Sequence, residues 1–319
     1  MRGVHTTRSV RISGTGSYAP ATIVTNEELE TRVPTTAQWV FDNLGIRERR
    51  VAAPEERTSD LAAEAGRRAI ASAQIEPNAI DLIIVATATP DRSAPSTACI
   101  VQRKLGISNR CAAFDVAAVC SGFLYAMTIA SQFIDGGTYE TVLVIGADTF
   151  SRITDWTRRD AVFFGDGAGA AVMTRTPHAN GLFSSLMFAD GCGQDNFTVY
   201  PGDAAFTMNG RAVYEIGTNV LPEAIRAIVT ANGLQLSDVA AIVPHQPSIR
   251  MLKRTAELLG VPFEIVHTNM DRYANTSSGT IPILLDEVAR DGKIQSGQYV
   301  VFAAVGSGWT WGAALYRWQ

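Results

Sequence analysis

The stretch that decides the fold is Ala113-Phe-Asp-Val-Ala-Ala-Val-Cys-Ser-Gly-Phe-Leu-Tyr-Ala-Met127. Phe114 and Val116 are typical of a buried strand, whereas the apolar residues from Phe123 onward recur at helical spacing. Cys120 therefore falls at or near the start of a helix, where unpaired amides and the helix dipole favour an anion. We expect this position to lower the pKa of the thiol below about 8.5 and to create a nucleophile. A buried, inert cysteine is the alternative, because free cysteine is among the most buried residue types.

Apolar strands alternate with helices on both sides of this stretch. The sequence predicts strands over residues 10–17, 80–86, 141–146, 239–244, 299–304 and 312–316. Continuous apolar strands separated by helices indicate a sheet that is covered on both faces. The second half of the chain repeats this order after a changeover near residues 175–185. We therefore expect a duplicated α/β layered fold with two halves, residues 1–178 and 179–319.

Composition excludes several classes of protein. The 319 residues are 46% hydrophobic and 18% charged, and the formal charge of −4 gives no general attraction to nucleic acid or anionic membranes. No run approaches the ~20 apolar residues of a membrane span, and residues 1–10 lack the apolar core of a secretory signal. Four cysteines without a Cys-x-x-Cys pair predict neither a disulfide framework nor zinc, and we expect a reducing cytoplasm.

A glycine-rich segment, Gly165-Asp-Gly-Ala-Gly-Ala-Ala-Val172, has the spacing of dinucleotide-binding loops. Its context is wrong for that function, because we expect a strand at 161–164 before it and a strand-like run at 170–173 after it, rather than a long helix. No acidic residue ends a second strand about 20 residues later, as ribose recognition requires. A structural turn is the favoured interpretation. A non-catalytic dinucleotide-binding or acyl-CoA-binding protein built on this loop is the competing functional class.

Three further segments carry polar groups at the ends of predicted elements. His245 follows a buried strand, where open α/β folds bind ligands, although a structural histidine is the alternative. Asn275 precedes a helix that it could cap, and its amide could instead donate to a developing oxyanion. The segment Gly306-Ser-Gly-Trp-Thr-Trp-Gly312 follows another buried strand. Its glycines allow backbone amides to approach a substrate closely and form an oxyanion hole. Residues 46–51 are expected to form an exposed basic segment.

Taken together, these motifs resemble those of the β-ketoacyl-acyl carrier protein synthase III family. The matching segments are Asp115-Val-Ala-Ala-Val-Cys-Ser-Gly122, Phe164-Gly-Asp-Gly-Ala-Gly-Ala-Ala-Val172, Pro244-His-Gln246, Tyr273-Ala-Asn-Thr-Ser277 and Gly306-Ser-Gly-Trp-Thr-Trp-Gly312. They occur in order over essentially the whole chain, together with Trp39 and Gly45-Ile-Arg-Glu-Arg49. The resemblance implies a duplicated five-layer α-β-α-β-α thiolase-like fold and a homodimer. The Cys-His-Asn set separates this family from thiolase-fold relatives that use Cys-His-His or Cys-His-Cys.

The resemblance also implies a two-step reaction. Cys120 takes an acyl group from coenzyme A, with the oxyanion held between the backbone amides of Cys120 and Ser307. Malonyl-acyl carrier protein then loses carbon dioxide, and His245 and Asn275 donate hydrogen bonds to the resulting enolate. The enolate attacks the acyl-cysteine and releases a 3-oxoacyl thioester, which begins fatty-acid or polyketide-type synthesis. No metal, flavin or nicotinamide is expected, and acyl-CoA is a substrate.

Substrate-binding residues are implied in the same way. Trp39 matches an adenine-stacking tryptophan, although it could be a core residue of its helix. Arg159 matches a phosphate-binding arginine, although it could simply be solvated. Arg250 matches a basic position at the mouth of the coenzyme A tunnel, which suits an acidic carrier protein. Ala94 stands where some acetyl-selective members place a bulky aromatic residue against the partner's acyl pocket, so a longer, branched or aromatic starter could fit.

Three departures from the family pattern bear on the substrate. Asn43 stands where several relatives have an arginine on coenzyme A. Pro247-Ser248 replaces the Ala-Asn that follows His-Gln in the family, and Ser307 replaces the middle of a glycine triplet. These changes keep a second enzyme function open, in which the acyl-cysteine passes its acyl group to an alcohol or amine without decarboxylation.

Overall fold

Two five-stranded sheets form the framework of the part of the chain that the computed structural model describes, residues 3–176, 181–200 and 202–319. The first sheet has the order β2-β8-β7-β5-β6, with β2 (Val10–Tyr18), β5 (Leu82–Ala86), β6 (Ala112–Val116), β7 (Thr141–Thr149) and β8 (Asp166–Arg175). The second has the order β1-β9-β14-β13-β12, with β1 (His5–Thr7), β9 (Phe183–Ala189), β12 (Val239–Pro244), β13 (Tyr299–Gly306) and β14 (Thr310–Arg317).

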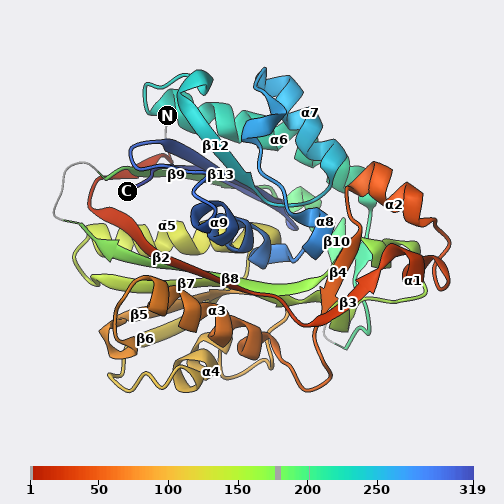
Figure 1. Cartoon of the computed structure of the whole chain (residues 1–319), viewed down its shortest axis with the longest axis horizontal. Helices are drawn as coiled ribbons and strands as arrows, with labels where there is room; N and C mark the ends of the chain where they lie inside the picture. The colour runs from red at the N-terminus through yellow and green to blue at the C-terminus, as the bar shows by residue number, and fades with distance from the viewer. Residues whose placement is uncertain (1–2, 177–180, 201) are drawn as a thin grey trace.

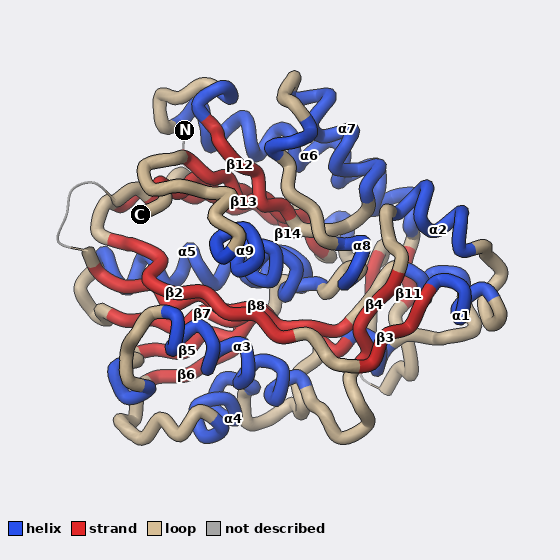
Figure 2. Tube along the Cα trace, viewed as in Figure 1, coloured by secondary structure: helices blue, strands red, loops and turns tan. Residues whose placement is uncertain are grey.

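Helices cover both sheets and also fill the space between them, which gives five layers (Figure 1). The central layer contains α5 (Gly122–Asp135) and α9 (Thr280–Arg290). The outer layers contain α3 (Thr58–Ser72) and α4 (Thr97–Lys104) on the first sheet, and α6 (Gly210–Ala231) and α7 (Ile249–Leu259) on the second. In Figure 2 the strands form two bands with helices above, between and below them. The predicted α-β-α-β-α arrangement is confirmed.

The central helices bury apolar residues against both sheets, although α9 also carries Asp286, Glu287 and Arg290. Phe123 and Met127 on α5 and Leu284 and Leu285 on α9 are buried in one cluster with residues of both sheets. A helix that is buried on all sides is apolar all round, whereas a surface helix has a single apolar stripe. This burial explains the long apolar run that follows Cys120 in the sequence.

The two sheets repeat one pattern of strands. The order and pairing of the strands match one by one: β9 corresponds to β2, β12 to β5, β13 to β7 and β14 to β8. In place of the β5–β6 pair, the second sheet has a parallel bridge between Ile242 and Val266. The short strand β1 is an addition, because it extends the second sheet by pairing with β9. The first residues of the chain therefore join the sheet of the second half. The expected division after residue 178 lies in 177–180, outside the described residues.

Smaller elements gather at one end of the molecule, on the right of Figure 1. They are α1 (Asn26–Glu30), α2 (Ala37–Leu44), α8 (Met270–Tyr273), the ribbon of β3 (Thr22–Thr25) and β4 (Glu48–Val51), and the ribbon of β10 (Phe197–Thr198) and β11 (Thr207–Met208). The Thr36 hydroxyl caps α2 by accepting from the Trp39 amide, and Gly45 ends the helix with a φ of 78°. None of the helices within the described ranges is long and apolar enough to cross a membrane.

The segment over residues 46–51 is not the exposed basic run that the sequence suggested. Arg49 in β4 is fully buried. Its guanidinium donates to the Val24 carbonyl, the Asn26 side-chain oxygen and the Val162 carbonyl. These bonds replace part of the hydration that a buried cation loses, and they tie β4 to the helical turn Arg159–Val162 that precedes the glycine-rich loop.

Candidate active site

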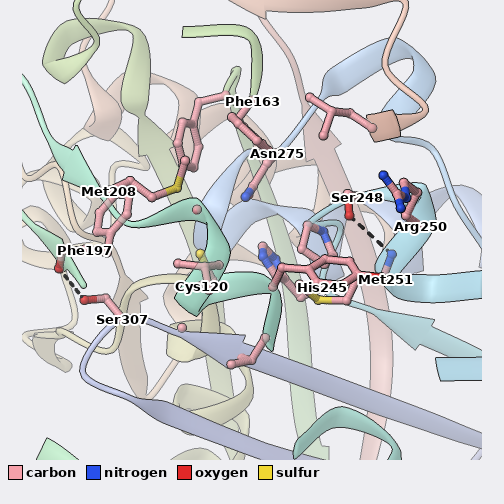
Figure 3. A pocket seen from close by; sticks show the side chains of 18 of the residues that line it. Cys120, Phe163, Phe197, Met208, His245, Ser248, Arg250, Met251, Asn275 and Ser307 are labelled. Carbon is pink, nitrogen blue, oxygen red and sulfur yellow. Dashed lines mark hydrogen bonds between the residues drawn. The ribbon is translucent and has the colours of Figure 1, made fainter. Parts of the chain in front are cut away.

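A cavity of about 320 Å³ opens at this end of the molecule, and Cys120, His245 and Asn275 all line it (Figure 3). Cys120 comes from the start of α5, His245 from the end of β12 and Asn275 from the segment before α9. Much of the wall is apolar and includes Phe163, Phe164, Phe197, Met208, Val305 and Trp309. The fold therefore brings together the three polar residues that the sequence singled out, and it does so from both halves of the chain.

Cys120 lies in a tight turn, Val119–Ser121, that leads directly into α5. Its thiol donates a hydrogen bond to the Ser277 hydroxyl oxygen over 3.8 Å. Burial raises the pKa of Cys120 to about 12. The expected lowering of the thiol pKa at the start of the helix is therefore wrong, because loss of hydration disfavours the thiolate more than nearby hydrogen bonds favour it.

His245 is buried just beyond β12, and its backbone N–H donates to the Ala303 carbonyl over 2.8 Å. Its Nδ1 lies 2.8 Å from the Thr280 hydroxyl oxygen. Burial lowers the pKa of His245 to about 3, so the imidazole is neutral. A neutral imidazole has one nitrogen that donates and one that accepts, and its partners decide which is which.

Asn275 has its side-chain amide held in one orientation. The Ser277 backbone N–H donates to Oδ1 over 2.8 Å, which identifies Oδ1 as the acceptor and leaves Nδ2 as the donor. Figure 3 shows this nitrogen directed toward Cys120 and His245. The alternative in which Asn275 caps the following helix is wrong, because α9 begins only at Thr280.

The end of β13 packs directly against the turn that holds Cys120. A Cβ atom at Gly306 would lie 3.0 Å from both the Ala118 carbonyl oxygen and the Ser121 nitrogen, so glycine allows this close approach without displacing the turn. Ser307 lines the cavity, and its hydroxyl donates to the Phe197 carbonyl over 2.7 Å. The oxyanion role of the Cys120 and Ser307 amides stays a prediction.

The turn that follows Asn275 is fixed to the first half of the chain. The backbone N–H and the hydroxyl of Ser278 both donate to Oδ2 of the buried Asp148 in β7, over 3.0 and 2.6 Å. A Cβ atom at Gly146, also in β7, would lie 2.1 Å from the Ser278 carbonyl oxygen.

The turn after Asn275 resembles the turn that contains Cys120. Val119 and Ser277 have φ values of 46° and 52°, and each begins a tight turn that leads into a central helix. Cys120 and Ser278 thus occupy equivalent places.

The remaining predicted residues lie at the mouth of the cavity or outside it. Trp39 and Arg250 line the mouth, and the Arg159 guanidinium lies 4.1 Å from the centre of the Trp39 ring. Arg250 donates to the side-chain oxygen of Asn43 over 2.9 Å, so this departure from the family pattern orients a neighbouring cation. Ala94 is exposed on the connection between β5 and α4 and does not line the cavity.

The glycine-rich loop supports the site instead of forming a nucleotide pocket. Residues Arg159–Val162 form a helical turn where a strand was expected, and Gly167 and Gly169 lie in β8, which pairs antiparallel with β7. The Gly165 N–H donates to the Asn275 carbonyl over 3.1 Å. The dinucleotide-loop interpretation fails because no helix follows these glycines.

Sequence reasoning missed four residues that shape the cavity. Phe197 and Met208 come from the two-residue strands β10 and β11, which are too short to give a periodic signal. Ser277 and Thr280 contact Cys120 and His245. The sequence signal for Ser277 and Thr280 was the cluster of hydroxyl residues that follows Asn275.

Comparison with known proteins agrees with this geometry. Two family models match: 3-oxoacyl-[acyl-carrier-protein (ACP)] synthase III over residues 114–191, and its C-terminal model over residues 229–318. The β-ketoacyl-[acyl-carrier-protein] synthase III of Thiobacillus denitrificans is 45% identical over 315 residues, which cover 96% of this chain and 98% of that protein.

Solved structures give the same result. The crystal structure of 3-oxoacyl-[acyl-carrier-protein] synthase III from Aquifex aeolicus VF5 has a TM-score of 0.93 and 38% identity, covering 97% of this chain and 100% of that chain. The priming β-ketosynthase of the R1128 polyketide biosynthetic pathway has a TM-score of 0.91 and 30% identity, covering 98% and 96%. The chain therefore belongs to the 3-oxoacyl-[acyl-carrier-protein] synthase III family of thiolase-fold condensing enzymes, as its motifs predicted.

Proposed function

We propose that this cavity transfers an acyl group from acyl-CoA to Cys120 and then condenses it with malonyl-acyl carrier protein, giving a 3-oxoacyl thioester. The observation that carries the proposal is the convergence of Cys120, His245 and Asn275 on one largely apolar cavity that opens beside Trp39 and Arg250. The amide of Asn275 is already oriented as a donor. Preorganised donors of this kind stabilise negative charge that develops during a reaction.

In the first half-reaction the Cys120 sulfur forms a bond to the acyl carbonyl carbon, and the bond from that carbon to the coenzyme A sulfur breaks. The thiol proton ends on the departing coenzyme A sulfur, so the step is neutral overall. Burial raises the pKa of Cys120, so the resting thiol is protonated, and we propose that it loses its proton as the sulfur attacks. The backbone amides of Cys120 and Ser307 hold the oxyanion of the tetrahedral intermediate.

In the second half-reaction the malonyl group loses carbon dioxide, and the electron pair of the broken carbon–carbon bond remains as an enolate. Its oxygen accepts hydrogen bonds from Nδ2 of Asn275 and Nε2 of His245. The enolate carbon then bonds to the acyl carbonyl carbon, and the Cys120 sulfur leaves and takes up one proton. Both half-reactions balance with these groups and one proton that the Cys120 thiolate takes from solvent, so we propose that acyl-CoA is a substrate and that no metal or redox cofactor takes part.

The mouth of the cavity suits a nucleotide carrier. We place the adenine of coenzyme A against Trp39 and a phosphate near Arg159, whose guanidinium already stacks on that ring. Arg250 is exposed at the same mouth and offers a cation to an acidic carrier protein. Such a contact raises the rate of encounter more than the affinity.

A homodimer is part of the proposal. Within the described residues β6 is an edge strand, and its Phe114 and Val116 are only half-buried. An exposed edge of this kind pairs readily with another chain, and a partner there lies close to the exposed Ala94 that follows β5.

We also propose that the protein works in a reducing cytoplasm, which the free thiols of all four cysteines support.

The starter group and the pathway define two candidate roles. Similarity to the Thiobacillus denitrificans synthase supports the initiation of fatty-acid synthesis. Similarity to the R1128 priming β-ketosynthase supports a second role in polyketide-type synthesis. In the proposed homodimer we place Ala94 against the partner's acyl pocket, where its small side chain favours starters longer, more branched or more aromatic than acetyl.

The test is a panel of acetyl-, isobutyryl-, hexanoyl- and benzoyl-CoA scored by intact mass, followed by malonyl-acyl carrier protein and measurement of carbon dioxide. We expect one acyl adduct per chain, its absence in Cys120→Ala, and carbon dioxide release with a 3-oxoacyl product. An adduct that persists in Cys120→Ala would overturn the nucleophile. An acyl-Cys120 that releases no carbon dioxide but acylates an alcohol or amine would replace condensation with simple acyl transfer.

A further inference from the structure

His245 can carry its proton on either ring nitrogen, and this choice decides what the residue does in the cavity. Burial keeps the ring neutral, so only one of the two nitrogens bears hydrogen. If Nδ1 bears it, Nε2 presents a lone pair and repels an enolate oxygen. If Nε2 bears it, His245 donates beside Asn275. The group that contacts Nδ1 therefore sets the chemistry of Nε2.

Thr280 is the group that contacts Nδ1, and its hydroxyl has one proton for two acceptors. The hydroxyl oxygen lies 2.8 Å from Nδ1 of His245 and 2.9 Å from the Ser277 carbonyl oxygen. The Ser277 carbonyl already accepts the backbone N–H of Thr280. In the described part of the chain, Nδ1 of His245 has no other hydrogen-bond partner than Thr280.

Burial makes Nδ1 depend on Thr280 in both tautomers. Thr280 and His245 are each 2% exposed, so Nδ1 has little access to water. With the imidazole proton on Nδ1, Thr280 accepts from His245 and donates to the Ser277 carbonyl. With the proton on Nε2, Nδ1 can only accept, so the Thr280 hydroxyl turns to it while the Ser277 carbonyl keeps its backbone bond. The proposed function requires the second arrangement. We propose that Thr280 is a positioning residue that donates its hydroxyl proton to Nδ1 of His245 and thereby holds the imidazole proton on Nε2. This inference rests on the proposed function, in which Nε2 donates to the enolate.

The surrounding bonds agree with this assignment. Cys120 donates to the Ser277 hydroxyl and not to His245, so the resting thiol does not use Nε2 as a base. The Ser277 N–H orients the amide of Asn275. One turn, residues 277–280, thus sets the direction of both donors: Ser277 fixes Asn275, and Thr280 fixes His245.

The test compares Thr280→Val, which removes the hydroxyl at nearly constant volume, with Thr280→Ser, which keeps it. We expect Thr280→Val to slow carbon dioxide release from malonyl-acyl carrier protein about tenfold, the order of one hydrogen bond. Acylation of Cys120 by acyl-CoA stays within about twofold, and Thr280→Ser restores most of the lost rate. Thr255→Val is the matched control, because Thr255 is a buried helical threonine whose hydroxyl, among the residues that the structure describes, bonds only the Met251 carbonyl.

A spectroscopic readout separates the two proposals. In ¹⁵N-histidine-labelled protein we expect His245 to show a protonated Nε2 and an unprotonated Nδ1, and Thr280→Val to mix the two forms. A protonated Nδ1 in the wild-type protein would overturn the inference, as would an equal loss of both half-reactions in Thr280→Val. If the wild-type protein forms no acyl-Cys120 while its His245 signals follow Thr280 as expected, the proposed function fails and the Thr280 assignment stands.

Discussion

Replacing Trp39 with alanine removes the ring on which the nucleotide of acyl-CoA is proposed to stack. The ring lines the mouth of the cavity, and the Arg159 guanidinium lies 4.1 Å from its centre. Stacking of one base on an aromatic side chain is worth ~1–3 kcal/mol. The base displaces the guanidinium, whose exposed cation–π contact is worth ~0.5–1 kcal/mol.

The difference between these two terms sets the size of the effect. A net loss of roughly 1.4 kcal/mol corresponds to about a tenfold increase in KM for acyl-CoA. The limiting rate of Cys120 acylation stays within about twofold, because uniform binding affects KM without changing the chemical step.

The assay follows acylation of Cys120 by mass spectrometry as a function of thioester concentration. Acyl-pantetheine lacks the nucleotide, so its KM is expected to be the same for Trp39→Ala and the wild-type protein. Phe41→Ala is the matched control: Phe41 lies on the same helix, α2, beneath the Arg47 guanidinium at 3.9 Å, and it does not line the cavity. An unchanged KM for acyl-CoA, or an equal rise for acyl-pantetheine, would refute the stacking role.

Three further predictions follow from the buried parts of the site. Gly146→Ala places a Cβ atom 2.1 Å from the Ser278 carbonyl oxygen and is expected to lower the free energy of unfolding in urea by ~1–3 kcal/mol. The control Gly191→Ala, whose Cβ meets nothing within 4 Å, is expected to change it by no more than ~0.5 kcal/mol. Equal unfolding midpoints for the two variants would contradict the close approach. The rate of alkylation of Cys120 by iodoacetamide is expected to rise tenfold per pH unit through pH 10. A raised pKa of about 12 leaves roughly 10⁻⁴ of the thiol ionised at pH 8, against roughly 10⁻¹ for the ordinary value of 9.0. A plateau of the rate near pH 8 would show that the thiolate is stabilised. Asn275→Ala is expected to reduce carbon dioxide release about 10²- to 10³-fold with acylation of Cys120 within a few-fold; parallel losses in both would argue for a general structural defect.

The apolar elements of the fold were predictable because their signals are local. Helix α7 is bounded by such local signals, since the Ser248 hydroxyl caps its first turn and Gly260 ends it in the left-handed region. Strand β9 was missed because Ser184 and Ser185, on opposite faces of the strand, are both buried. Ser184 is satisfied by the side chains of Thr6 and Asn232, which are distant in sequence. Polar residues buried by such partners give no alternating apolar pattern.

The site was predictable in its residue types and not in its electrostatics. Cys120, His245 and Asn275 were found because each stands in a distinctive motif at the end of an element. The pKa of Cys120 was misjudged because it depends on burial by segments far away in the chain. The environment of Arg49 was misjudged for the same reason, since oxygens outside its own strand accept its bonds.

The repeated turn at Cys120 and Ser278 has a consequence for stoichiometry. Each copy of the duplicated unit presents one side chain at the entrance to a central helix, yet the two side chains meet opposite environments. Cys120 faces the cavity, whereas the Ser278 hydroxyl donates to Asp148 and is buried. In the proposed function, the copy that contains Cys120 carries the acyl group, whereas the copy that contains Ser278 uses the same place to hold the two halves together. We therefore expect a saturated chain to carry a single acyl equivalent.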